Sequence, residues 1–262
     1  MTSFGVIAQR DTFARWIEIL DARFSIQIDA IRYDALQAAL EQYAAGIGFS
    51  LEALLHAAET NRLQSDNWTM ILHLATNHET RFFRSPAALE LITVISKSIR
   101  SPRILSVGCS SGEEPYSIAV ELLKAGMCAF RIHGTDVSAV CIETAQAGIY
   151  PRHPAVPARA ATSNKTHMTF HAWVRGLVTF QQHNILQDRP IELTKPNVVL
   201  TQNMLIYYRP ATRYEILDRL ANLLDAGGFL ITGPAETISW PGAGLIRHSH
   251  SHLTVFQRPA DV

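Results

Sequence analysis

The stretch ILSVGCSSGEEPYSIAVELL, residues 104–123, constrains the fold of this 262-residue chain more than any other part. Its short apolar run predicts a buried strand, Gly108 and Gly112 bound a tight turn, and an apolar helix follows from Pro115. A strand that turns through glycines into a helix is typical of nucleotide sites, because ligands bind beyond the carboxyl ends of parallel strands. The stretch therefore predicts a Rossmann-like α/β domain.

The chain after residue 85 keeps the same alternation of strands and helices. Further strands are expected at 129–136, 198–208 and 229–233, and helices at 87–99, 139–147 and 213–224. This order predicts a mostly parallel sheet with helices on both faces. Two last strands, 245–248 and 253–257, fit an antiparallel edge hairpin. Residues 151–180 are rich in proline and alanine and predict a short β insertion, with a strand pair within 168–180.

The first 85 residues predict a separate, all-helical domain. Apolar residues recur at helical spacing, Ser50 suits a helix N-cap, and we find no strand pattern. We therefore divide the chain into an N-terminal helical domain, 1–85, and a second domain, 86–262.

Composition excludes several classes of function. The formal net charge is zero and no Lys/Arg run occurs, which argues against nucleic acid as a partner. No apolar run reaches the roughly 18 residues of a membrane span, and residues 1–10 lack a signal-peptide core. The three cysteines show no CxxC spacing, so we interpret them as reduced thiols of a cytoplasmic protein, expected to be a monomer.

Two glutamates and an aspartate identify the ligand expected at the glycine turn. Glu113 and Glu114 stand where a dinucleotide would place its pyrophosphate, so they oppose that ligand and favour a cation such as S-adenosylmethionine. The alternative is that they only favour the helix dipole. Asp136, at the end of the next strand, can accept hydrogen bonds from ribose hydroxyls; the alternative is a turn aspartate that caps the helix from Ser138.

The segment HETRFFR, residues 78–84, closes the helical part with Phe82 and Phe83 between Arg81 and Arg84. One interpretation is a helix end packed on a core with its charges in water. The other is a site in which Arg84 faces an anion.

Several motifs together resemble the CheR-type chemoreceptor glutamate methyltransferases. They are HETRFFRSPAALE, SVGCSSGEEPYSIAVEL, GTDVSAVCIETAQAGIY, HNIL, and QNMLIYY followed by a helix and AGGFLITGPAE, and they occur in the family's order over residues 66–240. The resemblance implies a methyltransferase that uses S-adenosylmethionine to esterify glutamates of chemoreceptor signalling helices and releases S-adenosylhomocysteine.

The resemblance also implies site residues. His78, Thr80 and Arg84 match the cofactor-contacting segment, Glu114 a cofactor-contacting glutamate, and Asp136 the ribose acid. Asn184 and Ile185 match the pair that flanks the adenine, and Thr201 and Gln202 precede the Asn203–Tyr207 motif. Tyr207 would face the transferred methyl group opposite Arg84, and these two would be the catalytic residues. No metal is implied.

The chemistry itself needs no general base. A glutamate side chain, with a reference pKa of ~4.3, is already an anion at neutral pH. Attack on a sulfonium methyl disperses two charges, so a water-poor site that aligns the carboxylate is the main requirement. Arg84 can orient the carboxylate through forked hydrogen bonds and the Tyr207 hydroxyl can hold one oxygen.

Four features depart from the family pattern. His78 replaces the first Asn of NETxFFR, Thr201-Gln202-Asn203 replaces CRN, and the sequence GPAE, ending at Glu236, replaces GHSE. Residues 1–75 carry five basic and nine acidic side chains, a net charge of −4, which would not attract an acidic receptor helix. These departures leave open a cofactor-binding regulatory relative without turnover, or a small-molecule methyltransferase with a helical lid.

Three histidines near the C-terminus and one cysteine carry weaker signals. His248, His250 and His252 alternate, so a strand would place all three on one face, as a metal patch or as an ordinary polar edge. Cys109 adjoins the glycine turn, and the two glutamates nearby predict an unreactive thiol.

Overall fold

The computed structural model describes residues 3–187, 189–237 and 239–260, with side chains from Thr12 onward. It forms two compact units, Met1–Asn77 with Tyr207–Thr212, and His78–Ile206 with Arg213–Val262. Within the described part of the chain, no helix combines the length and apolarity that crossing a membrane requires.

The first unit is helical. It contains α1 (Ser3–Phe24), the 3-10 helix η1 (Ala30–Arg32), α2 (Tyr33–Gly46), α3 (Leu51–Glu59) and α4 (Ser65–Ala75). Trp16, Leu40 and Leu54 are fully buried at its centre. The Ser50 hydroxyl accepts a hydrogen bond from the Ala53 amide at 3.1 Å, which confirms the predicted N-cap of α3.

The short segment Tyr207–Thr212 belongs to this helical unit although it lies far along the chain. The Gln27 amide donates to the Tyr207 carbonyl at 2.7 Å, and Arg209 forms an ion pair with Asp21. These two contacts fasten the segment to the end of α1 and to the residues that follow it.

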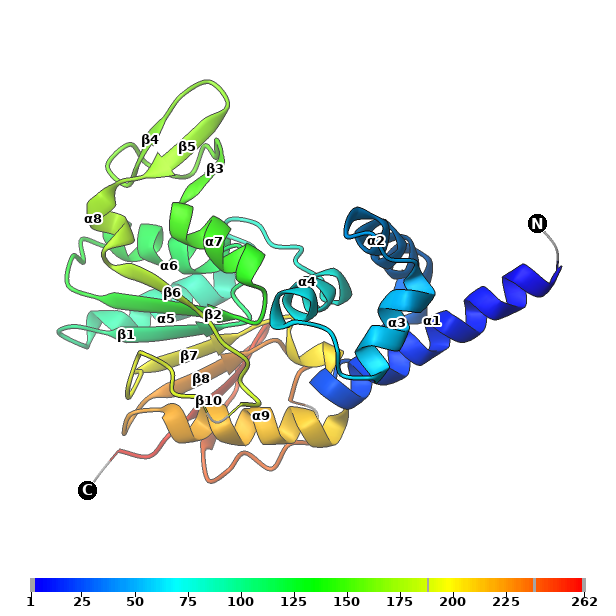
Figure 1. The fold of residues 1–262 in the computed structure, drawn as a ribbon. Coiled ribbons are helices and arrows are strands. Elements are labelled where there is room, and N and C mark those ends of the chain that lie inside the picture. Colours follow the sequence, from blue (N-terminus) through cyan, green and yellow to red (C-terminus); the bar gives the residue numbers. More distant parts are fainter. Residues whose placement is uncertain (1–2, 188, 238, 261–262) are drawn as a thin grey trace. The chain divides into compact units, whose positions relative to one another are not determined.

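The second unit is built on a seven-stranded sheet (Figure 1). In chain order it contains α5 (Pro86–Lys97), β1 (Arg103–Val107), α6 (Glu113–Lys124), β2 (Arg131–Asp136), α7 (Ala139–Ala147), β3 (Ile149–Pro151), β4 (Ala161–Ser163), β5 (His167–Phe170), α8 (Ala172–Arg175), β6 (Val178–Gln182), β7 (Val198–Thr201), η2 (Leu205–Tyr207), α9 (Pro210–Leu223), β8 (Phe229–Thr232), β9 (Ile246–His248) and β10 (Thr254–Gln257). The end of η2 and the beginning of α9 overlap the segment Tyr207–Thr212, which belongs to the first unit.

The strand order of the large sheet is β6-β2-β1-β7-β8-β10-β9. The first five strands are parallel, and β10 runs antiparallel to both β8 and β9. This confirms the predicted Rossmann-like, mostly parallel sheet and its antiparallel edge hairpin. The central strands β1 and β7 contain residues with no exposed surface, such as Ile104 and Val198. Such burial is expected of strands that are covered on both faces of the sheet.

Two strand predictions were wrong. The stretch 178–182 is not half of a strand pair in the insertion but β6, which pairs in parallel with β2, Val178 opposite Ile132. Its alternating burial places Val178 and Phe180 inward, so packing rather than the neighbouring sequence decides its partner. The strand predicted at 198–208 ends at Thr201, because Asn203 adopts a φ of +60° and the chain continues into η2.

The insertion is a three-stranded antiparallel sheet of its own, in the order β3-β5-β4, which stands beside the large sheet beyond α7 and α8 (Figure 1). An aromatic cluster fastens it to the unit. The rings of Tyr116 and Phe170 stack at 4.0 Å, and Tyr150 meets the Phe82 ring edge-on at 5.1 Å. The insertion is therefore packed against the glycine-turn helix rather than hanging free.

The alternating histidines do not share a strand face. The strand β9 ends at His248, whose Nε2 lies 3.0 Å from the Gln257 side-chain oxygen. His250 and His252 fall in the turn before β10, where period-two alternation no longer holds.

Candidate functional site

The turn after β1 requires its glycines. Gly108 and Gly112 adopt φ values of +74° and +93°. A Cβ at Gly112 would lie 2.7 Å from the Ala145 Cβ, and one at Gly108 would lie 2.9 Å from the Met204 side chain. Both the positive φ values and the small space around the two glycines therefore exclude a larger residue. The first turn of α6 begins directly after Gly112.

Asp136 lies at the end of β2 and organises this turn. One carboxylate oxygen accepts from the Ser110 amide at 2.9 Å, and the other accepts from the Ser138 amide at 2.9 Å. Asp136 is thus a turn aspartate, as in the alternative considered, although the N-cap of α7 is Ser138 and not Asp136. Each oxygen retains a second lone pair, so the ribose role remains a prediction that these contacts leave possible.

Glu114 is the most perturbed carboxyl group of the site. Its Oε1 accepts from the Ser106 hydroxyl at 2.7 Å. Its pKa is raised to about 7 as the net result of four causes: burial raises it most, the Ser106 hydrogen bond lowers it, the negative charge of Glu236 raises it, and the Arg84 guanidinium lowers it. Glu113 accepts from the Ser111 hydroxyl at 2.7 Å, and burial raises its pKa as well. A favourable interaction with the helix dipole does not by itself explain why two carboxyl groups lie where burial disfavours their charged forms.

Glu236 belongs to the same charge cluster and was not predicted as a site residue. Its side chain is only 2% exposed. It accepts hydrogen bonds from the amides of Gly233 at 2.8 Å and Leu205 at 3.0 Å. Burial raises its pKa while these backbone donors lower it. Glu236 thus links the chain that follows β7 to the end of β8.

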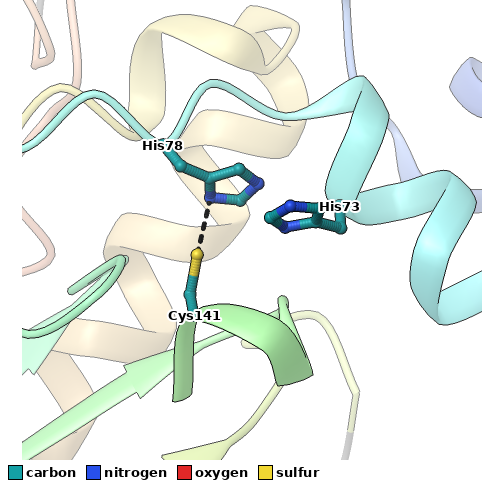
Figure 2. Close-up of side chains that lie close together, drawn as sticks. All are labelled: His73, His78 and Cys141. Atoms are coloured by element: carbon teal, nitrogen blue, oxygen red, sulfur yellow. Dashed lines mark hydrogen bonds between the residues drawn. The ribbon is translucent and has the colours of Figure 1, made fainter. Parts of the chain in front are cut away.

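The HETRFFR segment is a loop after α4, not the end of a helix, since α4 ends at Ala75. Three contacts hold it to other parts of the second unit, to which it belongs. The His78 carbonyl accepts from the Ser110 hydroxyl at 3.0 Å, the His78 Nδ1 lies 3.2 Å from the Cys141 Sγ (Figure 2), and the Phe83 amide donates to the Ser117 hydroxyl at 2.9 Å. The segment therefore lies along the glycine turn and the helix that follows it.

Within this loop the aromatic and basic residues have different surroundings. Phe82 and Phe83 pack on the apolar core of the unit, and Phe83 has a φ of +57°. Arg84 is exposed, with Nη1 donating to the Glu79 carbonyl at 2.8 Å, and Arg81 is exposed too. The loop thus combines packed aromatic rings with a guanidinium in solvent, as the first interpretation expected, whereas an anion facing Arg84 stays a prediction. Thr80 is half-buried in the same loop.

The other predicted residues lie at the carboxyl ends of further strands. Asn184 and Ile185 follow β6; the Asn184 side-chain oxygen accepts from the Leu186 amide at 3.0 Å, and Ile185 is buried. Thr201 ends β7 and Gln202 follows it, half-buried. In a parallel sheet these strand ends share one edge with the glycine turn, where ligands bind.

Tyr207 falls outside this group. It lies in η2 within the segment of the first unit, whereas Arg84 belongs to the second. Its proposed position opposite Arg84 therefore stays a prediction.

The residues present fit a cationic nucleoside cofactor. The Thr201 hydroxyl is buried without a hydrogen-bond partner among the described residues, so a ligand at the end of β7 would meet an unsatisfied polar group. Glu114, Glu113 and Asp136 supply anionic oxygens for an amino group, a sulfonium and ribose hydroxyls. Burial, Asp136 and Glu114 raise the pKa of the Cys109 thiol, which disfavours its reactive thiolate form, as predicted.

Three residues of the site, Glu236, Ser110 and Cys141, were not predicted, and the sequence carries only weak signals for them. Glu236 follows the last parallel strand in a motif that departs from the family, and Ser110 and Cys141 are small residues without a distinctive pattern. Their roles arise from contacts between distant parts of the chain.

Comparison with known proteins agrees with this geometry. Residues 78–251 match the family model described as "CheR methyltransferase, SAM binding domain". A chemotaxis protein methyltransferase of Vibrio parahaemolyticus is 30% identical over 63% of this chain and 66% of its own length. One from Vibrio anguillarum is 29% identical over 72% of this chain and 75% of its own. A probable biofilm formation methyltransferase, WspC, of Pseudomonas aeruginosa is 34% identical over 60% of this chain and 41% of its own.

The chain thus spans about two thirds of the first of these relatives and less than half of WspC. The family match covers most of the second unit, including the glycine turn, Asp136 and the HETRFFR loop. A Rossmann-like sheet with a carboxylate-lined glycine turn, together with this match, shows that the chain belongs to the CheR methyltransferase family and that its cofactor is S-adenosylmethionine.

Proposed function

We propose that this protein transfers a methyl group from S-adenosylmethionine to glutamate carboxylates of chemoreceptor signalling helices, forming glutamyl methyl esters. The observation that carries the proposal is the exposed Arg84 guanidinium, whose charge lowers the pKa of the half-buried Glu114 carboxyl group. A cation that interacts with a cofactor-side carboxyl group, yet remains open to solvent, suits the recognition of an incoming carboxylate.

The chain's own residues then have to orient and desolvate the substrate. Bound cofactor supplies an electrophilic methyl on a sulfonium, and the glutamate anion at neutral pH needs no base. Arg84 would hold the carboxylate in line by two hydrogen bonds, with the Tyr207 hydroxyl as the second contact. The Phe82 and Phe83 rings, packed on the core beneath, would anchor Arg84 and exclude water on that side.

The charge distribution favours a receptor that contacts the second unit. Residues 1–75 carry a net charge of −4, and because the 23 basic and 23 acidic residues of the chain balance, residues 76–262 carry +4. The stretch 144–187, which includes the small β-sheet, has no acidic residue, and its four basic side chains, Arg152, Arg159, Lys165 and Arg175, are all exposed. An acidic receptor helix would be attracted to this surface rather than to the helical unit.

The decisive experiment offers methyl-labelled S-adenosylmethionine with purified cytoplasmic fragments of chemoreceptors. Carboxyl methyl esters release methanol in mild alkali, whereas N-methyl groups do not. We expect alkali-labile label on receptor glutamates. Label that stays on the protein after alkali would sink the proposal.

Arg84→Ala and Arg81→Ala form a matched pair for the same assay, since both arginines are exposed and three residues apart. Only the Arg84 variant should lose label transfer. The regulatory alternative, which the substitutions at His78 and at Thr201-Gln202 motivate, predicts a different outcome: S-adenosylhomocysteine binds the wild-type protein, but no receptor fragment acquires label.

A further inference from the structure

One contact of the HETRFFR loop has no role in the function proposed so far. The Nδ1 of His78 lies 3.2 Å from the Sγ of Cys141, within the range of a sulfur hydrogen bond, and Figure 2 shows the imidazole of His78 facing the thiol. The two residues are 63 positions apart in the chain. Cys141 is buried, 5% exposed, whereas His78 is half-buried.

Cys141 occupies the first turn of α7, where the backbone is already fixed. Its amide donates to the Ser138 hydroxyl, the N-cap of α7, at 3.2 Å. Ser138 in turn donates its own amide to Asp136 at 2.9 Å. The thiol is thus carried by a rigid element that begins at the predicted ribose-binding carboxylate.

A second contact closes the arrangement through the glycine turn. The Ser110 hydroxyl donates to the His78 carbonyl at 3.0 Å and lies 3.9 Å from the Cys141 Sγ, while the Ser110 amide donates to Asp136. His78 is therefore held at its carbonyl by the turn after β1 and at its side chain by α7. Both holding elements also bind Asp136.

The thiol can act as the hydrogen donor of the His78 contact when the imidazole Nδ1 carries no proton. Burial, together with Asp136 and Glu113, raises the pKa of Cys141, so the sulfur stays protonated at neutral pH. A neutral S–H group can donate to the imidazole Nδ1 without creating a charge beside the carboxylates. A plain packing role for the sulfur would require no such donor.

We propose that His78 and Cys141 are positioning residues that form a latch, holding the HETRFFR loop against the first turn of α7 so that Thr80 and Arg84 are in place before the cofactor binds. The inference rests on the proposed function for the role of Arg84, but the latch itself is a property of the cofactor site. Preorganisation of this kind strengthens binding because less conformational freedom is lost when the ligand arrives.

Binding of S-adenosylhomocysteine by calorimetry tests the latch without any methyl transfer. A hydrogen bond to a thiol is weak, so Cys141→Ala and His78→Ala should each raise Kd by roughly fivefold. The Kd of the double variant should be no higher than that of the single variant with the higher Kd. Independent, multiplied losses would overturn the proposal. Cys128→Ala, at an exposed cysteine, serves as the control and should bind as the wild type does.

Two conservative variants separate the hydrogen bond from packing. Cys141→Ser keeps a donor, and His78→Asn, which places the residue of the family motif there, keeps polar atoms near the thiol. Both should recover most of the lost affinity. If Cys141→Ser binds no better than Cys141→Ala, the sulfur fills space and the latch is refuted.

Alkylation of the thiols gives a second readout that is independent of ligand. Iodoacetamide labelling, followed by peptide mass spectrometry, reports Cys109, Cys128 and Cys141 in one sample. His78→Ala should speed labelling of Cys141 at least fivefold, leaving the buried Cys109 and the exposed Cys128 unchanged. Equal acceleration of Cys109 would mean general loosening of the fold, and an unchanged Cys141 rate would mean that His78 does not cover it.

These outcomes stay separate from the fate of the proposed function. If receptor fragments take up no label while the binding and alkylation results hold, the latch stands and only the substrate proposal fails. If binding and alkylation are unaffected by the variants while receptors are methylated, the latch alone is wrong.

Discussion

Replacing Glu114 by glutamine should stabilise the fold at the expense of the cofactor site. Burial raises the pKa of Glu114 from 4.5 to about 7 in the folded protein. A raised carboxyl pKa means that the folded state favours the protonated form. The stabilisation linked to this group is therefore complete below pH 4.5 and is lost as the pH rises through 7.

The size of the effect follows from the shift. At about 1.4 kcal/mol per pKa unit, the shift corresponds to an upper bound of about 3 kcal/mol. Because solvent reaches part of the Glu114 side chain, we expect about 2 kcal/mol after allowance for screening. Glutamine keeps the shape and can accept the same hydrogen bond from Ser106 without ever carrying the charge.

Urea unfolding of the cofactor-free protein measures this difference. At pH 8 the free energy of unfolding of Glu114→Gln should exceed that of the wild type by about 2 kcal/mol, and at pH 5 by less than about 1 kcal/mol. Glu143→Gln, which removes an exposed carboxylate from α7, shows the effect of net charge alone. A gap that does not grow with pH, or a variant less stable at pH 8, would refute the reasoning.

Three further outcomes follow from the same site. The affinity of the wild type for S-adenosylmethionine, measured by calorimetry, should rise about tenfold from pH 6 to pH 8 as Glu114 loses its proton, and Glu114→Gln should bind weakly with no such rise. Arg84→Ala should lower kcat for receptor methylation by roughly 100-fold but shift the Kd of S-adenosylhomocysteine by less than about threefold, whereas equal losses would make Arg84 only a cofactor contact. Gly112→Ala should abolish cofactor binding and lower the free energy of unfolding by at least about 2 kcal/mol, since its Cβ would lie 2.7 Å from the Ala145 Cβ; retained binding in calorimetry would contradict this.

The elements predicted with success are those that local patterns specify. The helix Ala139–Ala147 begins at Ser138, whose hydroxyl caps Cys141, and ends at Gly148 with a φ of +64°. The run Arg103–Val107 is short, apolar and bounded by a glycine, so its place in a parallel sheet was clear from a few residues. Capping, chain reversal and hydrophobic periodicity act between near neighbours in the chain, and they are therefore visible in the sequence.

The predictions that failed depended on distant partners. Residues 178–182 look like the second half of a hairpin, but β6 pairs with β2, more than 40 positions earlier. The stretch 198–208 has apolar residues on both sides of Thr201-Gln202-Asn203 and was predicted as one strand, yet Glu236 binds the Leu205 amide and the ladder ends at Thr201. Only the packed sheet can choose between such alternatives, because the competing local conformations have similar energies.

The candidate site divides in the same way. The sequence by itself determined the mostly parallel α/β sheet, the glycine turn and the acidic residues beside it, because hydrophobic periodicity and close backbone turns demand particular residue types. The tertiary structure alone decided that the negative charge of Glu236 raises the pKa of Glu114, and that the Cys141 thiol contacts the His78 side chain. Such contacts require three-dimensional closeness of side chains that no local pattern links, and the pKa shifts arise only once burial removes water from them.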